Sequence, residues 1–377
     1  MITVEQKDKL IDLNFLSNKE KDHVAIICHD SPDPDCFASA MAFREIANHF
    51  GLKSTIYYGG EISHTQNRVM VNVLNIQCIK LDKDDETSDI IRKTLQHSYI
   101  IVVDTASWCN QKCSSISDFV SGNTIPDMII DHHDLNPNIT CSYVHMPYGS
   151  CSTILYNILK QCSIDIDNVL ATALYIGIST DTDDLKSEGS TNEDEKAFTE
   201  LRQIIDPEKY LRIFNYPKPL ALLTLRKRFY STLCNEGNSL IIANVGVINP
   251  QQRSLMAELC EEMLEIETIE TSVVLALVDE GFEKPKYLVA SFRSKTPAID
   301  MQDFIKRVFL KKDGRKNSAA SGGGRKGAGA AEIKLDFCLC ETLDNLSQKD
   351  DHAEYDVLVG SLFETFKRKI QSEKEKI

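Results

Sequence analysis

The stretch that decides the fold is Asp127-Met-Ile-Ile-Asp131-His132-His133, in which a short apolar run ends in an acid and two histidines. Such a run is typical of a buried strand, so the polar residues are expected where the strand ends. Side chains alternate between the two faces of a strand, which means that both imidazoles cannot point into the core. We expect one imidazole in a site and the other on its rim, with Asp131 holding an imidazole in one tautomer. Taken alone, the triplet would equally suit a solvated strand-to-loop junction.

Three other apolar segments end in acids or histidines. The run 24–28 leads into His29, Asp33 and Asp35, the run 99–103 ends at Asp104, and the helical segment 168–178 leads into Asp181. Acids at the end of a helix oppose its macrodipole, and a bound cation would offset that cost. Any one acid could be a helix cap. Six residues at matching places favour one metal site instead: His29, Asp33, Asp35, Asp104, His132 and Asp181.

The order of these segments predicts an α/β fold with a parallel sheet. The β-branched run 99–103 is apolar throughout, as in strands that are buried on both faces. Further strands are expected at 24–28, 54–58, 127–131 and 142–145, and helices at about 37–50, 152–159, 168–178 and 193–205. Ligands bind beyond the carboxyl ends of the strands in open α/β sheets. All four segments place their polar residues there.

A chain of 377 residues is expected to hold two domains. We place a metal-binding domain at 1–205, a proline-containing linker at 206–235 and a smaller α/β substrate domain at 236–377. In the second domain, strands are expected at 239–246, 272–278, 287–293 and 332–339, and helices at 251–264, 301–309 and about 353–374. A polar, basic, glycine-rich loop is expected from 311 to 331.

Composition narrows the class of protein. A formal charge of −14 argues against broad adhesion to long duplex nucleic acid, because such binding depends on neutralising phosphates. Twelve cysteines without a Cys-x-x-Cys motif suggest a reducing, cytoplasmic setting. The sequence has neither a signal-peptide pattern nor the roughly 18 consecutive apolar residues of a membrane span. We therefore expect a cytoplasmic protein without a membrane partner.

Carboxylates and imidazoles without a thiolate suit Mn²⁺ or Mg²⁺, with Co²⁺ also tolerated, better than they suit structural zinc. Six such residues are enough for two ions that share a carboxylate. A two-metal site about 3.5–4 Å across generates hydroxide from water and clamps both oxygens of an in-line phosphoryl displacement. The residues therefore predict metal-dependent hydrolysis of a phosphate ester.

These segments resemble the four ordered motifs of the DHH phosphoesterase superfamily: His29-x-x-Pro-Asp33-x-Asp35, Asp104-Thr-Ala, Asp131-His132-His133 and Gly177-Ile-Ser-Thr-Asp181-Thr. The resemblance covers about the first 205 residues. The second half resembles the DHH-associated substrate domain, in Ser291-Phe-Arg293-Ser294 and in the glycine-rich stretch 321–330. This pairing of domains is similar to that of short-oligoribonucleotide hydrolases that also act on 3′-phosphoadenosine 5′-phosphate.

The resemblance implies two metal ions with shared ligands. One would be held by His29, Asp33, Asp104 and Asp181, and the other by Asp35, Asp104, His132 and Asp181. His133 would lie near the scissile phosphate, and Asp131 would orient a histidine.

The resemblance also implies a substrate-binding role for part of the second domain, with catalysis in the cleft between the domains. Arg293 would bind a substrate phosphate. The backbone of the glycine motif would approach phosphate or base closely, because glycine lacks a Cβ. The implied contacts are Arg293, Ser294, Gly322, Gly323, Gly324 and Arg325.

Three positions depart from the family pattern. Arg325 stands where a histidine often follows the three glycines, which keeps a cation that can bind phosphate bidentately but removes a titratable group. Pro34 and Asp183 each stand in place of a frequent glycine. None of the six metal-ligand positions changes, so these departures bear on substrate choice.

The expected reaction is exonucleolytic hydrolysis of very short RNA to 5′-mononucleotides, and 3′-phosphoadenosine 5′-phosphate could share the site. Cleavage of cyclic dinucleotides or their linear products is an alternative. An inorganic pyrophosphatase would share the four motifs but should lack a stretch such as 321–330. A nucleotide-binding regulator without turnover is the alternative from another class, and the complete ligand set argues against it. The oligomeric state stays open, with a homodimer as one alternative.

Overall fold

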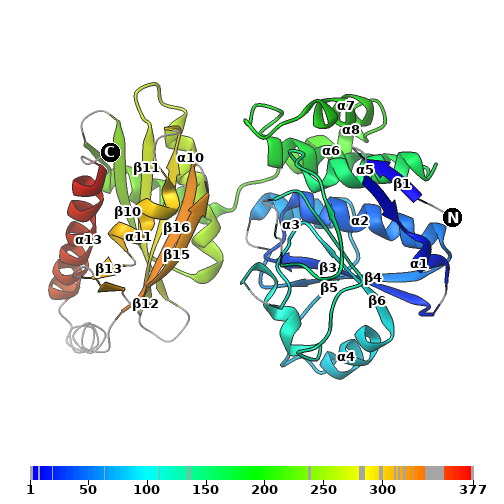
Figure 1. The fold of residues 1–377 in the computed structure, drawn as a ribbon. Coiled ribbons are helices and arrows are strands. Elements are labelled where there is room, and N and C mark those ends of the chain that lie inside the picture. The colour runs from blue at the N-terminus through cyan, green and yellow to red at the C-terminus, as the bar shows by residue number, and fades with distance from the viewer. Residues whose placement is uncertain are drawn as a thin grey trace. The chain divides into compact units, whose positions relative to one another are not determined.

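The computed structural model divides the chain into two compact units, Met1–Pro217 and Lys218–Ile377 (Figure 1). It describes residues 3–6, 9–18, 20–62, 64–109, 111–133, 136, 138–236, 239–279, 285–296, 300–309, 311–312, 315–316, 320–325, 327–335 and 352–374. The boundary lies inside the expected linker 206–235, and this stretch carries two helices, α8 (Pro207–Phe214) and α9 (Leu220–Thr232).

The first unit is built on a six-stranded sheet in which every neighbouring pair is parallel. The apolar runs that predicted strands form its centre, and their burial on both faces explains their β-branched composition. In spatial order the strands are β5 (Cys78–Lys80), β4 (Lys53–Gly59), β3 (His23–Asp30), β6 (Ser98–Val103), β7 (Met128–Asp131) and β8 (Ser142–His145). The predicted α/β fold with a parallel sheet is confirmed.

Helices cover both faces of this sheet (Figure 1). On one face α2 (Pro34–His49), α5 (Cys151–Gln161) and α6 (Asn168–Thr182) pack together in the main core, which also takes Ile26 and Val103 from the strands. On the other face Ile91 and Leu95 of α4 (Ser88–Gln96) join Ile27 and Val102 in a smaller core. Around these lie α1 (Asn14–Ser17), α3 (Thr65–Val73), α7 (Asn192–Leu201) and two 3₁₀ turns, Gln111–Cys113 and Ser115–Asp118.

Some elements of the first unit were not predicted. The hairpin of β1 (Thr3–Gln6) and β2 (Lys9–Asp12) has two strands of four residues, and the amphipathic helix α4 has only nine residues. Helix α6 runs to Thr182, four residues beyond the predicted end, and stops where Asp183 adopts a left-handed conformation with φ of 49°. Glycine adopts that conformation without cost, which gives a physical reason for the frequent glycine at this position.

The second unit has a mixed six-stranded sheet in which β10 (Leu240–Ile248) and β11 (Thr271–Asp279) are the parallel pair. Helices α9 and α10 (Arg253–Leu264) pack on one face, and α11 (Met301–Val308) and α13 (His352–Lys374) pack on the other. A 3₁₀ turn, Pro250–Gln252, precedes α10. In spatial order the strands are β15 (Ala320–Arg325), β16 (Ala328–Lys334), β12 (Pro285–Ser294), β11 (Thr271–Asp279), β10 (Leu240–Ile248) and β9 (Cys234–Glu236).

The prediction of one continuous loop from 311 to 331 was wrong. Its described residues include the short strands β13 (Lys311–Lys312) and β14 (Arg315–Lys316) and the hairpin of β15 with β16. Gly322 lies opposite Ala331, and a Cβ at Gly322 would lie 2.7 Å from the Ala330 carbonyl oxygen. Glycine and alanine have low β-propensity, so close packing between neighbouring strands overrides the local preference here.

Among the helices of the described residues, none combines the length and the apolar character that a membrane crossing requires.

Candidate metal centre

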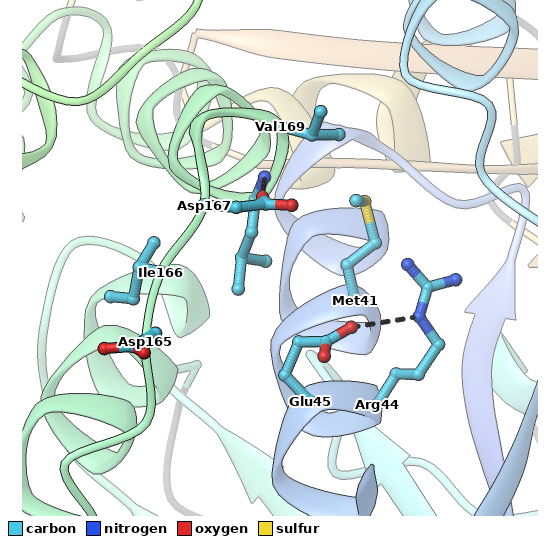
Figure 2. Close-up of a pocket in the computed structure, with 8 residues that line it drawn as sticks. Met41, Arg44, Glu45, Asp165, Ile166, Asp167 and Val169 are labelled. Atoms are coloured by element: carbon cyan, nitrogen blue, oxygen red, sulfur yellow. Dashed lines mark hydrogen bonds and ion pairs between the residues drawn. The ribbon is translucent and has the colours of Figure 1, made fainter.

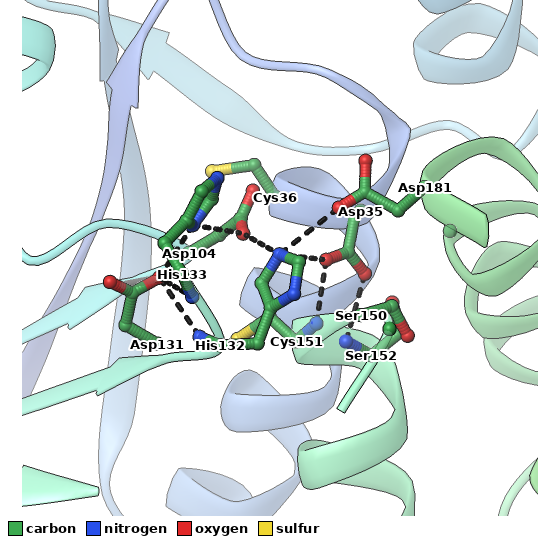
Figure 3. Close-up of polar contacts among 12 residues, drawn as sticks. Asp35, Cys36, Asp104, Asp131, His132, His133, Ser150, Cys151, Ser152 and Asp181 are labelled. Atoms are coloured by element: carbon green, nitrogen blue, oxygen red, sulfur yellow. Dashed lines mark hydrogen bonds and ion pairs between the residues drawn. The ribbon is translucent and has the colours of Figure 1, made fainter. Parts of the chain in front are cut away.

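The carboxyl ends of the parallel strands bring the predicted ligands of the first unit together (Figure 3). His29 lies near the end of β3, Asp104 directly follows β6, and Asp131 ends β7. The helices supply the other carboxylates, because Asp33 caps α2, Asp35 lies in its first turn, and Asp181 lies in the last turn of α6.

His132 stands at the centre of three carboxylates. Its Nε2 lies 3.0 Å from Asp181 Oδ2, 3.4 Å from Asp104 Oδ1 and 3.8 Å from Asp35 Oδ2. Its Nδ1 lies 3.1 Å from the carbonyl oxygen of Tyr148 and donates to it, so the neutral ring carries its lone pair on Nε2. A lone pair that faces three carboxylates requires a proton or a cation between them. The donor atoms of these four residues all lie within 4.8 Å of one another.

Several polar atoms at this centre are buried without a hydrogen bond. His132 Nε2, Asp104 Oδ1 and Asp131 Oδ2 have no hydrogen-bond partner among the described residues. An unpaired buried polar atom costs about 1–3 kcal/mol, so such atoms point to a missing ligand. Carboxylate and imidazole donors around one point are suited to a divalent cation such as Mn²⁺. The residues therefore fit a metal ion.

Asp104 faces two imidazoles with its two oxygens. Oδ1 lies 3.4 Å from His132 Nε2, and Oδ2 lies 3.6 Å from His29 Nε2. The same His29 nitrogen lies 3.9 Å from Asp33 Oδ2, while His29 Nδ1 donates to the carbonyl oxygen of Asp30 at 2.9 Å. The carboxylate of Asp104 therefore lies between the imidazoles of His29 and His132.

The backbone at Asp104 has a φ of 61°, a left-handed conformation that is uncommon outside glycine and tolerated best by aspartate and asparagine. Its N–H donates to the carbonyl oxygen of Ile130 on the neighbouring strand at 2.9 Å. Backbone strain of this kind persists where the surroundings fix it, and it concentrates at functional sites. The strained turn sets the carboxylate of Asp104 between the two histidines.

Asp35 is held by the beginning of α5. Its Oδ2 accepts from the N–H of Cys151 at 2.7 Å, and its Oδ1 accepts from the N–H of Ser152 at 2.8 Å (Figure 3). A helix N-terminus favours negative charge, which helps a fully buried carboxylate to ionise. Gly177 of α6 permits this packing, because a Cβ there would lie 2.3 Å from Ser152 Oγ and 3.1 Å from Asp35 Cα.

Cys36 also lies beside the centre, and the sequence did not indicate it. A nitrogen of His29, the Sγ of Cys36 and an oxygen of Asp104 all lie within 4.8 Å of one another. Burial raises the pKa of the Cys36 thiol well above its ordinary value, and Sγ donates to the carbonyl oxygen of Val103 at 3.7 Å. Cys36 is therefore a buried thiol beside the centre that is hydrogen-bonded to the backbone.

His133 lies on the rim, with its side chain 38% exposed against 10% for His132. Its Nδ1 lies 2.8 Å from Oδ1 of the buried Asp131, which also accepts the backbone N–H of His132 at 2.9 Å. His145 Nε2 lies 2.6 Å from the carbonyl oxygen of His133 and donates to it. Because Asp131 occupies Nδ1, Nε2 is the ring nitrogen of His133 that is left for another partner.

Residues 23–178 match the family described as DHH family, N-terminal domain. Residues 23–178 thus resemble a DHH-family N-terminal domain. This domain contains the strands and most of the site residues described above, with Asp131, His132 and His133 at the end of β7. Asp181 follows the matched range by three residues.

Two curated proteins match this chain over part of their length. An uncharacterised protein of Methanocaldococcus jannaschii is 28% identical over 337 residues, which are 89% of this chain and 63% of that protein. A probable manganese-dependent inorganic pyrophosphatase of Clostridium acetobutylicum is 26% identical over 195 residues, or 50% of this chain and 58% of that protein. The chain thus spans about three fifths of the length of these curated relatives.

A solved structure shares the fold of both units. The crystal structure of an exopolyphosphatase-related protein from Bacteroides fragilis superposes with a TM-score of 0.65 and covers 95% of this chain and 96% of its own. The sequence identity is 15%, so this similarity concerns the fold alone.

The buried carboxylates and imidazoles of this cluster change their pKa values strongly. Burial raises the pKa of Asp35 well above its ordinary value, and the charges of Asp104 and Asp181 raise it further. Burial alone would lower the pKa of His132, but Asp104 and Asp181 raise it to about 12. Without a metal, protons therefore neutralise this centre, and a divalent cation would have to displace them.

We expect Mn²⁺ binding to release protons and to weaken as the pH falls through about 6. The pKa of Asp33 is raised to about 6 by partial burial and by the charges of Asp104 and Asp181, so protons compete with the ion below that pH. Affinity should fall about tenfold per pH unit for each proton displaced. Calorimetric titration in buffers of different ionisation enthalpy measures the released protons. An affinity independent of pH between 5 and 7 would contradict this account.

The predicted substrate residues of the second unit lie in and beside its sheet. Arg293 Nε donates to Glu261 Oε1 at 2.8 Å, and Ser294 has a buried hydroxyl that lies 3.1 Å from the carbonyl oxygen of Glu270. Gly322, Gly323, Gly324 and Arg325 belong to β15 at the sheet edge. The exposed Gly323 has room for a side chain, whereas Gly322 has none.

A cavity of about 310 Å³ lies elsewhere in the first unit, between α2 and the start of α6 (Figure 2). Met41, Arg44 and Glu45 of α2 line it together with Asp165, Asp167 and Val169. No predicted site residue lines it. The metal centre lies at the opposite ends of the same two helices, where Asp35 begins α2 and Asp181 ends α6.

Sequence reasoning missed the backbone groups that orient the ligands. The carbonyl of Tyr148 contacts His132, and the N–H groups of Cys151 and Ser152 contact Asp35. Any residue type supplies these backbone groups, so the sequence does not indicate them. One signal was present, because Ser150 caps the apolar helix α5 and accepts from the N–H of Thr153.

Proposed function

We propose that this chain is a metal-dependent phosphoesterase that uses two divalent ions in its DHH domain. The observation that carries the proposal is the buried His132 Nε2, which faces carboxylate oxygens of Asp35, Asp104 and Asp181 at 3.0–3.8 Å without a hydrogen bond. One proton on Nε2 can serve only one of the three carboxylates fully, whereas a metal ion satisfies the imidazole and all three carboxylates together.

The proposed ligands fall into two overlapping sets. The first is Asp35, Asp104, His132 and Asp181, and the second is His29, Asp33, Asp104 and Asp181. Asp104 directs one oxygen to each histidine, as a bridging ligand must. Two bound ions, with Mn²⁺ favoured and Mg²⁺ or Co²⁺ as alternatives, would activate water and neutralise the phosphate. The relatives described as manganese-dependent support the choice of metal.

His133 is proposed to act on the substrate from the rim of the site. Its Nδ1 donates to Asp131, which orients the ring and leaves Nε2 to face a phosphate or leaving oxygen. The buried Asp131 thereby fixes one tautomer, as the aspartate does in other histidine–aspartate pairs.

Very short RNA is the substrate that we propose, with 5′-mononucleotides as products and 3′-phosphoadenosine 5′-phosphate as a further substrate. The charge of −14 suits a small nucleotide better than a long duplex and gives no reason to expect a membrane partner. In the second unit, Arg293 is available to a phosphate because its partner Glu261 is 54% exposed, and exposed pairs are weak. The outer backbone groups of the glycine-rich edge strand β15 are proposed to contact phosphate or base.

Hydrolysis of inorganic pyrophosphate is the second candidate, because probable manganese-dependent pyrophosphatases match about half of this chain. The remaining alternatives are cleavage of cyclic dinucleotides or their linear products, and nucleotide binding without turnover. We also propose a cytoplasmic location, with a homodimer as one alternative state.

The test is hydrolysis with Mn²⁺ of 5′-labelled di- to pentaribonucleotides, 3′-phosphoadenosine 5′-phosphate, cyclic dinucleotides and pyrophosphate in parallel. We expect dinucleotides to be cut fastest and to yield 5′-mononucleotides. Fastest turnover of pyrophosphate or of a cyclic dinucleotide would contradict the proposed substrate and keep the phosphoesterase chemistry. Binding of a nucleotide without any turnover would contradict the enzyme itself.

A further inference from the structure

The loop before α5 and the first residues of that helix, residues 148–152, contact two of the proposed ligands. The carbonyl of Tyr148 accepts from His132 Nδ1 at 3.1 Å. The N–H groups of Cys151 and Ser152 donate to the two oxygens of Asp35 at 2.7 and 2.8 Å. A displacement of the 148–152 segment would therefore move an imidazole and a carboxylate together.

Asp194 of α7 is hydrogen-bonded to this segment and to the next residue, Thr153. Its Oδ2 accepts from the N–H of Gly149 at 2.7 Å, and its Oδ1 accepts from the hydroxyl of Thr153 at 2.6 Å. Because the Thr153 hydroxyl donates to Asp194, the Ser150 hydroxyl 3.0 Å away donates to Thr153 Oγ1. One carboxylate thus fixes the middle of the segment and the first turn of α5.

The local role of Asp194 does not account for these contacts. Asp194 closes a capping box with Thr191, whose N–H and hydroxyl donate to Oδ2 at 2.8 and 2.6 Å. A capping box forms equally well at an exposed helix end. Here the carboxylate is fully buried, and its other bonds reach residues 41 and 45 positions away in the sequence.

Gly149 makes the close approach of Asp194 feasible. A Cβ on Gly149 would lie 3.0 Å from Asp194 Oδ2 and 2.6 Å from Cγ2 of Thr182, the neighbour of Asp181. The ends of α6 and α7 therefore meet at this glycine.

We propose that Asp194 is a positioning residue of the metal centre, which acts through the 148–152 segment on Asp35 and His132. The inference rests on the proposed metal centre. Residues that orient ligands from behind typically change metal affinity 10–100-fold when mutated.

The experiment measures Mn²⁺ affinity of the full chain by calorimetry, with thermal unfolding recorded for each variant. Asp194→Ala is expected to weaken binding about 10–100-fold, because the N–H of Gly149 loses its acceptor. Asp194→Asn should restore most of the affinity, since its oxygen can accept from Gly149 and its amide can donate to Thr153. Thr153→Val removes one donor to Asp194 and should weaken Mn²⁺ binding by less than Asp194→Ala does. This second variant keeps the proposal testable if Asp194→Ala does not fold.

Asp206→Ala is the matched control. Asp206 caps α8 in the same unit and accepts two backbone N–H groups at 3.0 Å, and within the described residues its carboxylate bonds only to α8. It should lower the unfolding temperature and leave Mn²⁺ affinity unchanged. Unchanged affinity in Asp194→Ala and Thr153→Val, or an equal loss in Asp206→Ala, would overturn the positioning role. A wild-type chain that binds no Mn²⁺ would overturn the metal centre itself, and the positioning role with it.

Discussion

Replacing Asp104 by asparagine is expected to reduce the number of bound Mn²⁺ ions and to lower kcat about a thousandfold or more. This loss corresponds to a rise of about 4 kcal/mol in the activation free energy. The two oxygens of Asp104 face His29 and His132 at 3.6 and 3.4 Å, so both ions would lose an anionic ligand. Asparagine has the same shape and tolerates the φ of 61° at this position. The variant should therefore fold, and the loss should reflect chemistry.

Asp183→Asn is the matched control for this change. Asp183 is also a non-glycine residue with positive φ, lies two positions from Asp181, and is exposed. Its replacement removes a carboxylate charge near the centre without removing a proposed ligand. Metal stoichiometry by calorimetry and kcat with the preferred substrate measure both variants. Full metal content in Asp104→Asn, or an equal loss in Asp183→Asn, would contradict the bridging role.

Replacing His133 by alanine should leave metal stoichiometry intact and lower kcat about 100- to 10,000-fold, as expected for the loss of a general acid. The neighbouring His132 is expected to play a different role. His132 is 10% exposed and faces three carboxylates, whereas His133 is 38% exposed and bonds to Asp131. His132→Ala should therefore lose metal as well as activity. This split between neighbouring residues tests the assignment of roles.

His97→Ala serves as the control, because His97 is an exposed histidine at the end of α4 in the same unit. Stoichiometry, kcat and KM of the three variants separate the effects. If His133→Ala also loses metal, His133 is a ligand and its proposed role on the substrate fails. If its kcat stays within a few fold of the wild-type value, it plays no part in the chemistry.

The fold of the first unit could be predicted because each strand and the polar residues at its end occupy one short stretch of sequence. The run 99–103 is β-branched and uninterrupted, and Asp104 follows it directly, so strand and polar end appear together in the sequence. Parallel pairing then brings Asp104 and Asp131 to one edge without knowledge of any long-range contact. The same reasoning places His29 and Asp35 at that edge.

What could not be predicted depends on contacts between distant residues. Asp35 and Ser152 are 117 positions apart, and the bond between them uses a backbone N–H that any residue would supply. The role of Asp194 could not be predicted either. An aspartate at this position is explained by the helix cap alone, and the sequence does not show its contacts with distant residues. The strand β15 was missed because its Ser-Gly-Gly-Gly sequence has the composition of a loop and is held by its pairing with β16.

The central claim is a two-ion centre bridged by Asp104, and anomalous diffraction from a crystal grown with Mn²⁺ tests it most directly. The account predicts two manganese peaks about 3.5–4 Å apart, with Asp104 between them. His132 and Asp35 should contact one ion, and His29 and Asp33 should contact the other. A single peak, or peaks that lie away from Asp104, would contradict the account.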